Sequence, residues 1–190
     1  MANNHGQNAR LGAIGESYVQ MRLMQQGWDA FNANSTYNNY KSVDIICLRP
    51  EDAKIRKPRT ALIQVKTTKG KSFPLGFTID QCLDMDFLKE RVIGPWVFIA
   101  VDSENDTSTF RCYVLTRNQV IELAYKAHDW YKNMWKRDKD IKGTSVAALN
   151  EVWLYGEIKK CEGTTSQHPA FVNPLKGAQT KEAWENIWTE

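Results

Sequence analysis

Two stretches decide the fold of this chain: Ser42-Val43-Asp44-Ile45-Ile46-Cys47-Leu48 and Ala61-Leu62-Ile63-Gln64-Val65-Lys66-Thr67. Both are rich in β-branched and apolar residues, a composition that favours strands. Arg49-Pro50-Glu51-Asp52 ends the first run, and the polar residues up to Pro58 suit an exposed connection. We therefore expect two neighbouring strands that pair as a hairpin.

The alternation of side chains along these strands places chemistry-bearing residues together. Gln64 and Lys66 share one face of the second strand. Asp44 lies near the start of the first strand, so hairpin pairing would bring it close to both. An isolated carboxylate between Val43 and Ile45 is costly to bury unless it is paired or binds a cation. Asp44 is therefore expected either to pair with Lys66 or to share a functional site with it.

The remaining pattern predicts an α/β domain in which helices cover a mixed central β-sheet. Leu11, Ile14, Tyr18 and Met21 recur at helical spacing and predict a helix over residues 10–26, packed through that stripe. Further strands are expected over 28–32, 95–101 and 110–115, the last two as an antiparallel pair. Helices are expected over 79–92, 116–132 and 181–188, and residues 73–77 suggest an irregular hydrophobic crossing.

Length and composition indicate one domain with a tail. A chain of 190 residues, 42% hydrophobic, can bury one core but is short for two. We expect a domain over residues 1–160, with its motif core at 10–115, and a C-terminal extension over 161–190 that carries a short docked helix. No apolar run approaches the roughly 18 residues of a membrane helix, and the first residues lack the apolar segment of a signal peptide. A soluble, cytoplasmic protein without a membrane partner is therefore expected.

Positive charge is concentrated in one part of the chain. The net charge is only +3, yet seven basic residues and no acidic residue occur from Lys54 to Lys71. Such a patch is typical of a surface that a polyanion approaches, although a solvated hairpin tip has the same composition. An Asn-rich loop before Asp44 adds side chains that reach or stack on bases, with a plain turn as the alternative. The candidate nucleic-acid contacts are Tyr40, Lys41, Lys54, Arg56, Lys57, Arg59, Lys69 and Lys71.

These residue types suit hydrolysis of a phosphodiester assisted by a divalent cation. Mg²⁺ prefers carboxylate and neutral oxygen ligands and keeps several waters. Asp44 offers a carboxylate, the Gln64 amide and the Val65 backbone carbonyl offer neutral oxygens, and Glu16 on the first helix offers a second carboxylate. The ammonium of Lys66 can orient the attacking water and stabilise developing negative charge.

The chain resembles the PD-(D/E)XK nuclease superfamily, in the branches whose final motif begins with Gln in place of Glu. The matching pieces, within residues 10–70, are Gly15-Glu16 in a helix, Ser42-Val43-Asp44 entering a strand, and Gln64-Val65-Lys66-Thr67 on the next strand. The resemblance implies a restriction endonuclease-like core, DNA as substrate and Mg²⁺ (or Mn²⁺) as cofactor. It also implies a possible homodimer, because most restriction-like enzymes cut both strands as dimers.

Carried over to this chain, the resemblance makes Asp44 the metal-binding acid, Gln64 the substituted metal-side residue, Lys66 the catalytic lysine and Glu16 the helix-borne acid. Two departures stand out: no Pro precedes Asp44, and Gln64 removes one negative charge. The site should then hold Mg²⁺ more loosely and depend more on Glu16. The expected function is a divalent-metal-dependent endonuclease that hydrolyses DNA phosphodiester bonds.

Two other functions remain open. Loss of the acid at Gln64 also suits a catalytically inactive nucleic-acid-binding protein with the same fold. Alternatively, the aromatic C-terminal half, with its several tryptophans, serves an interaction protein in which the motif is a coincidence.

Overall fold

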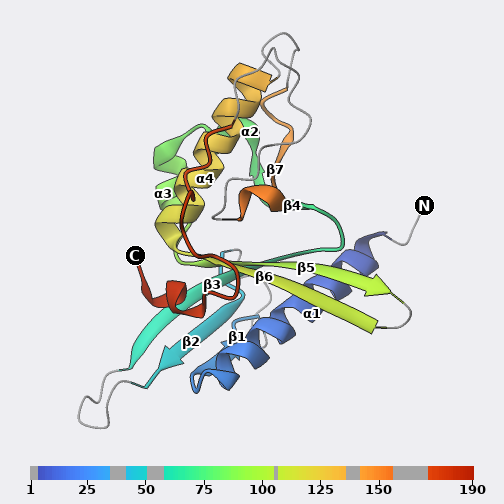
Figure 1. Cartoon of the computed structure of the whole chain (residues 1–190), viewed down its shortest axis with the longest axis vertical. Coiled ribbons are helices and arrows are strands. Elements are labelled where there is room, and N and C mark those ends of the chain that lie inside the picture. Colours follow the sequence, from blue (N-terminus) through green and yellow to red (C-terminus); the bar gives the residue numbers. More distant parts are fainter. Residues whose placement is uncertain (1–3, 35–41, 51–57, 105–106, 136–141, 156–170) are drawn as a thin grey trace.

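The computed structural model describes residues 4–34, 42–50, 58–104, 107–135, 142–155 and 171–190. Its centre is a five-stranded sheet with the order β1-β2-β3-β5-β6 (Figure 1). The pair β3–β5 is parallel, whereas β1–β2, β2–β3 and β5–β6 are antiparallel. The strands are β1 (Asp29–Asn32), β2 (Ile45–Arg49), β3 (Arg59–Thr68), β5 (Trp96–Glu104) and β6 (Thr107–Leu115). The predicted mixed sheet flanked by helices is thus confirmed.

Helices lie on both faces of this sheet (Figure 1). Helix α1 packs on one face, mainly against β1 and β3. The opposite face is covered by three helices and by a two-stranded antiparallel sheet, β4–β7. These elements are α1 (Asn4–Gln25), β4 (Ser72–Thr78), α2 (Ile79–Cys82), α3 (Met85–Arg91), α4 (Arg117–Trp130), the π-helical turn η1 (Tyr131–Trp135), β7 (Val146–Asn150), and the 3₁₀ helices η2 (Glu151–Trp153) and η3 (Trp184–Trp188).

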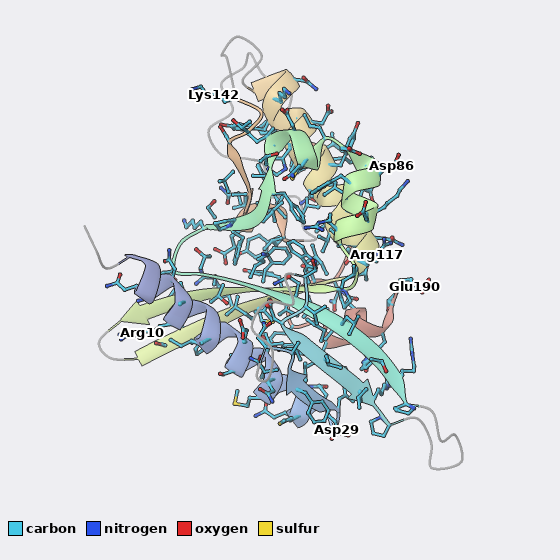
Figure 2. All side chains as sticks on the ribbon, turned by 180° about the vertical axis from the view of Figure 1, so that it is seen from behind. Arg10, Asp29, Asp86, Arg117, Lys142 and Glu190 are labelled. Carbon is cyan, nitrogen blue, oxygen red and sulfur yellow. The ribbon has the colours of Figure 1, made fainter. Side chains whose placement is uncertain are left out.

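The central sheet separates two hydrophobic cores, and side-chain alternation assigns each residue to one of them. In β5, Trp96 and Phe98 face the core beneath α2, α3, α4 and β4, whereas Val97 and Ile99 face α1. Figure 2 shows side chains filling the space between the sheet and the helices that carry Asp86 and Arg117, while α1, labelled at Arg10, crosses the other face. Successive residues of β3 therefore face alternately the α1 side and the opposite side of the sheet.

Helix α1 is rotated relative to the predicted stripe. Ile14 and Met21 are 48% and 46% exposed, and the buried face consists of Gly15, Val19 and Leu23. The cause is a close approach to β3: a methyl group built on Gly15 would overlap the Thr67 hydroxyl. The predicted helix is thus present, but the prediction that Ile14 and Met21 pack against the sheet was wrong.

Two further segments differ from the sequence-based expectation. Residues 73–77 form most of strand β4, because this strand pairs on both sides of an irregularity with β7, which lies about 70 residues further along the chain. The helix expected over 79–92 is divided into α2 and α3. Asp84 divides it by capping α3, since its carboxylate accepts hydrogen bonds from the backbone N–H groups of Asp86 and Phe87, both at 3.0 Å.

The 3₁₀ helix η3 is held against the α1 side of the sheet, whereas Leu175 packs in the core on the opposite side. Helix η3 buries Trp184, Ile187 and Trp188, and the ring of Trp188 meets Trp28 edge to face at 5.2 Å. The Asn186 side chain donates to the Val114 carbonyl at 2.8 Å. In the part of the chain that the structure describes, no helix has the length and apolar character needed to cross a bilayer.

Candidate active site

Asp44 is fixed between two strands immediately before β2 begins. Its backbone N–H donates to the Ile63 carbonyl, and its own carbonyl accepts from the Ala33 N–H, both at 2.8 Å. The first bond anchors Asp44 to β3 and the second to the end of β1. The antiparallel register that aligns Ile45 with Ile63 then sets Asp44 beside Gln64 and Val65, as the hairpin prediction required.

The Asp44 carboxylate lies along β3 and accepts several hydrogen bonds. Atom Oδ2 accepts the Val65 backbone N–H at 2.7 Å and also the Gln64 amide. The Asn34 side chain bonds to the carboxylate as well. Burial raises the pKa of Asp44 above its ordinary value, and these bonds together with the charge of Lys66 offset only part of that rise.

Glu16 brings a second carboxylate from α1. Its Oε2 accepts a hydrogen bond from the Asn32 amide at 2.9 Å. The Glu16 pKa is raised mainly by burial and further by the negative charge of Asp44, while the bond from Asn32 acts in the opposite direction. The charge of Asp44 is the smallest of these influences on the Glu16 pKa, so the two carboxylates interact only weakly in the metal-free protein.

Lys66 lies on the face of β3 opposite to α1. Its ammonium nitrogen is 5.0 Å from the ring centroid of Trp96, a cation–π arrangement. Gly76 on β4 approaches it closely: a methyl group built there would be 3.7 Å from Lys66 Nζ. Burial lowers the pKa of Lys66, and the charge of Asp44 opposes that change. Asp44 thus interacts electrostatically with both Glu16 and Lys66, which come from opposite sides of the sheet.

A pocket of about 320 Å³ opens beside Lys66. Gln64 and Lys66 belong to its wall, whereas Asp44 and Glu16 do not. The four predicted catalytic side chains are therefore neighbours, but only two of them face this cavity. The wall consists of Ser42, Gln64, Lys66, Leu75, Gly76, Phe77, Gln81, Phe87, Arg91 and Trp96.

The donor set suits a hard divalent cation such as Mg²⁺ or Mn²⁺. Asp44 and Glu16 supply two partly buried carboxylates with raised pKa values, and the Gln64 amide is the neutral neighbour of Asp44. The Gln64 amide presents its NH₂ group to Asp44, so its oxygen would reach a cation only after the amide turns. Among the described residues, no group of three or more His, Cys, Asp or Glu side chains is gathered as a metal site.

The predicted nucleic-acid contacts divide into three groups. Lys69 and Lys71 are exposed just beyond Lys66, around the connection from β3 to β4. Arg59 lies at the other end of β3, where it donates to the Trp188 carbonyl at 2.6 Å and its guanidinium carbon is 5.5 Å from the Trp188 ring centroid. Tyr40, Lys41, Lys54, Arg56 and Lys57 lie outside the described residues.

Several site residues were not identified from the sequence. Asn32 and Asn34 connect the end of β1 to Glu16 and Asp44, and the available signal was their position in an Asn-rich stretch after a strand. Trp96 and Gly76 flank the Lys66 ammonium, but they belong to β5 and β4. No local pattern identifies them, because only the tertiary fold brings these strands to Lys66.

Comparison with known proteins adds no assignment to this geometry. No protein-family model matches the chain, and no curated protein or solved structure is significantly similar to it. The chemistry of the site itself therefore carries the functional conclusion.

Proposed function

We propose that this protein is a divalent-metal-dependent endonuclease that hydrolyses DNA phosphodiester bonds. The observation that carries the proposal is the position of Asp44, whose carboxylate accepts hydrogen bonds from the Gln64 amide and the Val65 N–H on the strand that carries Lys66. In the proposed site, the Asp44 and Glu16 carboxylates would share the metal ion, and the Lys66 ammonium would contact the phosphate. This arrangement of charges suits phosphodiester hydrolysis.

Each residue has a distinct part in the proposed reaction. Asp44 and Glu16 would hold the metal, and Gln64 and the Val65 N–H fix the orientation of the Asp44 carboxylate. When bound, Mg²⁺ supplies Lewis-acid polarisation and a bound water of lowered pKa. Lys66 donates hydrogen bonds to a non-bridging phosphate oxygen and orients the attacking water.

The overall step adds water across one P–O bond. The water oxygen bonds to phosphorus, the bridging oxygen leaves with the other strand segment, and a proton reaches that oxygen. Lys66 is suited to the charge that develops, since its ammonium lies in a partly desolvated position beside Trp96, where electrostatic interactions are stronger than in water.

The surroundings of the site support the same proposal. The strand that follows Asp44 pairs antiparallel with the strand of Gln64 and Lys66, in a mixed sheet of the kind that the PD-(D/E)XK resemblance implies. A cytoplasmic location is consistent with the buried thiols of Cys47, Cys82 and Cys112, which are free. Burial raises the pKa of Cys47 and of Cys82 to about 12, so both are inert thiols.

Incubation of the purified protein with supercoiled plasmid in Mg²⁺ or Mn²⁺ tests the proposal. Conversion to nicked or linear DNA is expected, with EDTA abolishing it. Asp44→Asn, Glu16→Gln and Lys66→Met should each lower the rate at least about a hundredfold, in line with the loss of a charge-stabilising group. Asp86→Asn and Lys89→Met on exposed α3 are matched controls that should keep full activity. Cleavage that survives in both Asp44→Asn and Lys66→Met would refute the assignment.

A second candidate is a DNA-binding protein without catalysis, and the Gln64 to Asp44 hydrogen bond favours it. The Gln64 amide already donates a hydrogen bond to Asp44, and it is neutral where an acidic residue would add a third negative charge to those of Asp44 and Glu16. This alternative predicts salt-sensitive DNA binding with no cleavage in any metal. Calorimetric titration with Mn²⁺ separates the two functions, because binding that disappears in Asp44→Asn supports the nuclease.

A further inference from the structure

The pocket beside Lys66 has a chemistry that metal binding does not explain. Three aromatic side chains, Phe77, Phe87 and Trp96, belong to its wall, together with the cations Lys66 and Arg91. No acidic side chain is among its lining residues. Aromatic surface beside positive charge suits a ligand that has both a flat ring and a negative charge.

The aromatic rings stand at different angles around the cavity. Phe77 meets Phe87 edge to face, with centroids 5.5 Å apart and planes at 87°, and is tilted at 46° to Trp96. Cations lie over two of these rings: Lys66 over Trp96, and Arg91 over Phe87 at 5.9 Å. Phe87 and Phe77 are only partly buried. The wall thus keeps ring surface available for a planar group.

Polar side chains on the same wall can read the edge of a planar ligand. Gln81 closes the capping box of α2, and its Oε1 accepts the Thr78 N–H at 2.9 Å, which fixes the side chain in place. Gln64 is 8% exposed and borders both the pocket and Asp44. Amide groups donate and accept hydrogen bonds, as recognition of a nucleobase edge requires.

The cavity volume also constrains the ligand. At about 320 Å³, it lies at the lower end of the range for small-molecule sites, which begins near 300 Å³. A phosphate alone leaves most of this space empty, whereas a base with its sugar uses it. A base can enter only if it is unstacked, as in a single strand or when it is flipped from a duplex.

We propose that this pocket binds one unpaired nucleobase of a DNA strand, whose neighbouring phosphate contacts Lys66. The substrate is then single-stranded DNA or DNA with an unpaired nucleotide at the cleavage position. The phosphate contact rests on the proposed nuclease function, but the base-binding surface of Phe77, Phe87 and Arg91 does not depend on catalysis.

Binding measurements in EDTA test this proposal without cleavage. Fluorescence anisotropy would compare a short thymidine oligonucleotide, an abasic oligomer of the same length and charge, and the matching duplex. Wild-type protein should bind the thymidine strand about fivefold or more tightly than the abasic strand, given the usual contribution of one base stacked on an aromatic ring. Its affinity for the duplex should resemble that for the abasic strand.

Two pocket variants and one control make the result specific. Phe87→Leu keeps apolar volume but removes the ring, and Arg91→Ala changes an exposed residue of the same helix. Both should bring the thymidine-to-abasic ratio close to one, and Arg91→Ala should also weaken binding of the abasic strand. Lys89→Ala, on α3 but outside the pocket, should leave the ratio unchanged. Circular dichroism confirms that each variant is folded.

The outcomes separate the pocket from the nuclease. A preference for bases that is lost in Phe87→Leu supports the pocket even if no DNA is ever cleaved. Cleavage with equal affinity for thymidine and abasic strands would overturn the pocket proposal and leave the nuclease standing. Displacement of the strand by micromolar thymidine monophosphate would overturn it too, because the pocket would then serve a free nucleotide.

Discussion

The side-chain amide of Gln64 donates a hydrogen bond to the carboxylate of Asp44. A carboxylate at position 64 would repel Asp44, whereas the Gln64 amide attracts it. The pair is stable without a metal because a neutral donor faces a desolvated anion. Stability of the metal-free protein and metal affinity should therefore respond in opposite directions to the charge at position 64.

Gln64→Glu tests this opposition. In EDTA the variant should lose about 1–3 kcal/mol of stability at neutral pH, because a buried hydrogen bond becomes a like-charge contact. Its affinity for Mn²⁺ should rise about tenfold, as an extra anionic ligand is present. Thermal melts in EDTA and calorimetric titration measure the two effects, with Gln179→Glu as an exposed control. Lower Mn²⁺ affinity would contradict a role for position 64 beside the metal.

The raised pKa values of Asp44 and Glu16 predict how stability depends on pH. Each carboxyl binds its proton more tightly in the folded than in the unfolded state, so the folded protein carries more protons just above pH 4. Stability of the metal-free protein should therefore fall as pH rises from about 4 through the folded pKa values, by at most about 1.4 kcal/mol per pH unit for each group.

Urea denaturation in EDTA from pH 4 to 8 measures this dependence. Asp44→Asn and Glu16→Gln should each flatten part of the slope. Mn²⁺ should restore stability at neutral pH, by about 2.7 kcal/mol at a hundredfold excess over its dissociation constant. An unchanged slope in both variants would show that other groups control it.

The β2–β3 hairpin and the neighbours of Asp44 could be predicted because they follow from local alternation. Asp44, Gln64 and Val65 meet as the pairing of two consecutive strands requires. The environment of Lys66 could not be predicted in this way. Its neighbours Trp96 and Gly76 belong to strands that reach β3 through a parallel crossover and through a second sheet, whose pairings are non-local.

The orientation of α1 was also beyond the sequence pattern. Apolar spacing favoured Ile14 and Met21 as buried, yet both are about half exposed. Gly15, one of three glycines in the helix, determines the contact face, since its missing side chain lets α1 approach Thr67. Hydrophobic periodicity does not detect a contact made by the absence of a side chain.

Gly15→Ala should disrupt this contact and displace Glu16. The added methyl would overlap Thr67 Oγ1 and lie 2.9 Å from Thr67 Cβ, so α1 must move away from β3. We expect a loss of about 1–3 kcal/mol and weaker Mn²⁺ binding. Gly12→Ala is the matched control: nothing lies within 4 Å of its added methyl, so it should stabilise α1 by about 0.5–1 kcal/mol. Equal effects of the two changes would refute the packing argument.

The salt dependence of DNA binding should separate the lysines from Arg59. Lys69 and Lys71 are exposed beyond Lys66, whereas Arg59 contacts Trp188 at the far end of β3. Each lysine changed to alanine should reduce the slope of log K against log[salt] by about 0.9 if it neutralises one phosphate of a duplex. Arg59→Ala should destabilise the fold and leave that slope unchanged. Anisotropy titrations over a range of salt concentrations measure it, and a reduced slope in Arg59→Ala would extend the DNA path to that end of β3.

The absence of a side chain at Gly76 should affect the pKa of Lys66, because the two residues lie close together. Its φ of +82° favours glycine, and a methyl there would be 3.7 Å from the Lys66 ammonium. Gly76→Ala should cost about 1–2 kcal/mol through backbone strain. It should also remove water from Lys66, whose pKa burial already lowers. Because the ammonium is the form that contacts phosphate, the alkaline limb of the cleavage profile should move to lower pH.

Gly27→Ala is the control that separates the effect on the Lys66 pKa from the effect of backbone strain. Gly27 has nearly the same φ, +80°, and nothing lies within 4 Å of its added methyl. Both variants should therefore lose similar stability, but only Gly76→Ala should change the pH dependence of kcat/KM. If the two profiles coincide, the alkaline limb does not report Lys66, and the group that loses its proton in that range must be sought elsewhere in the site.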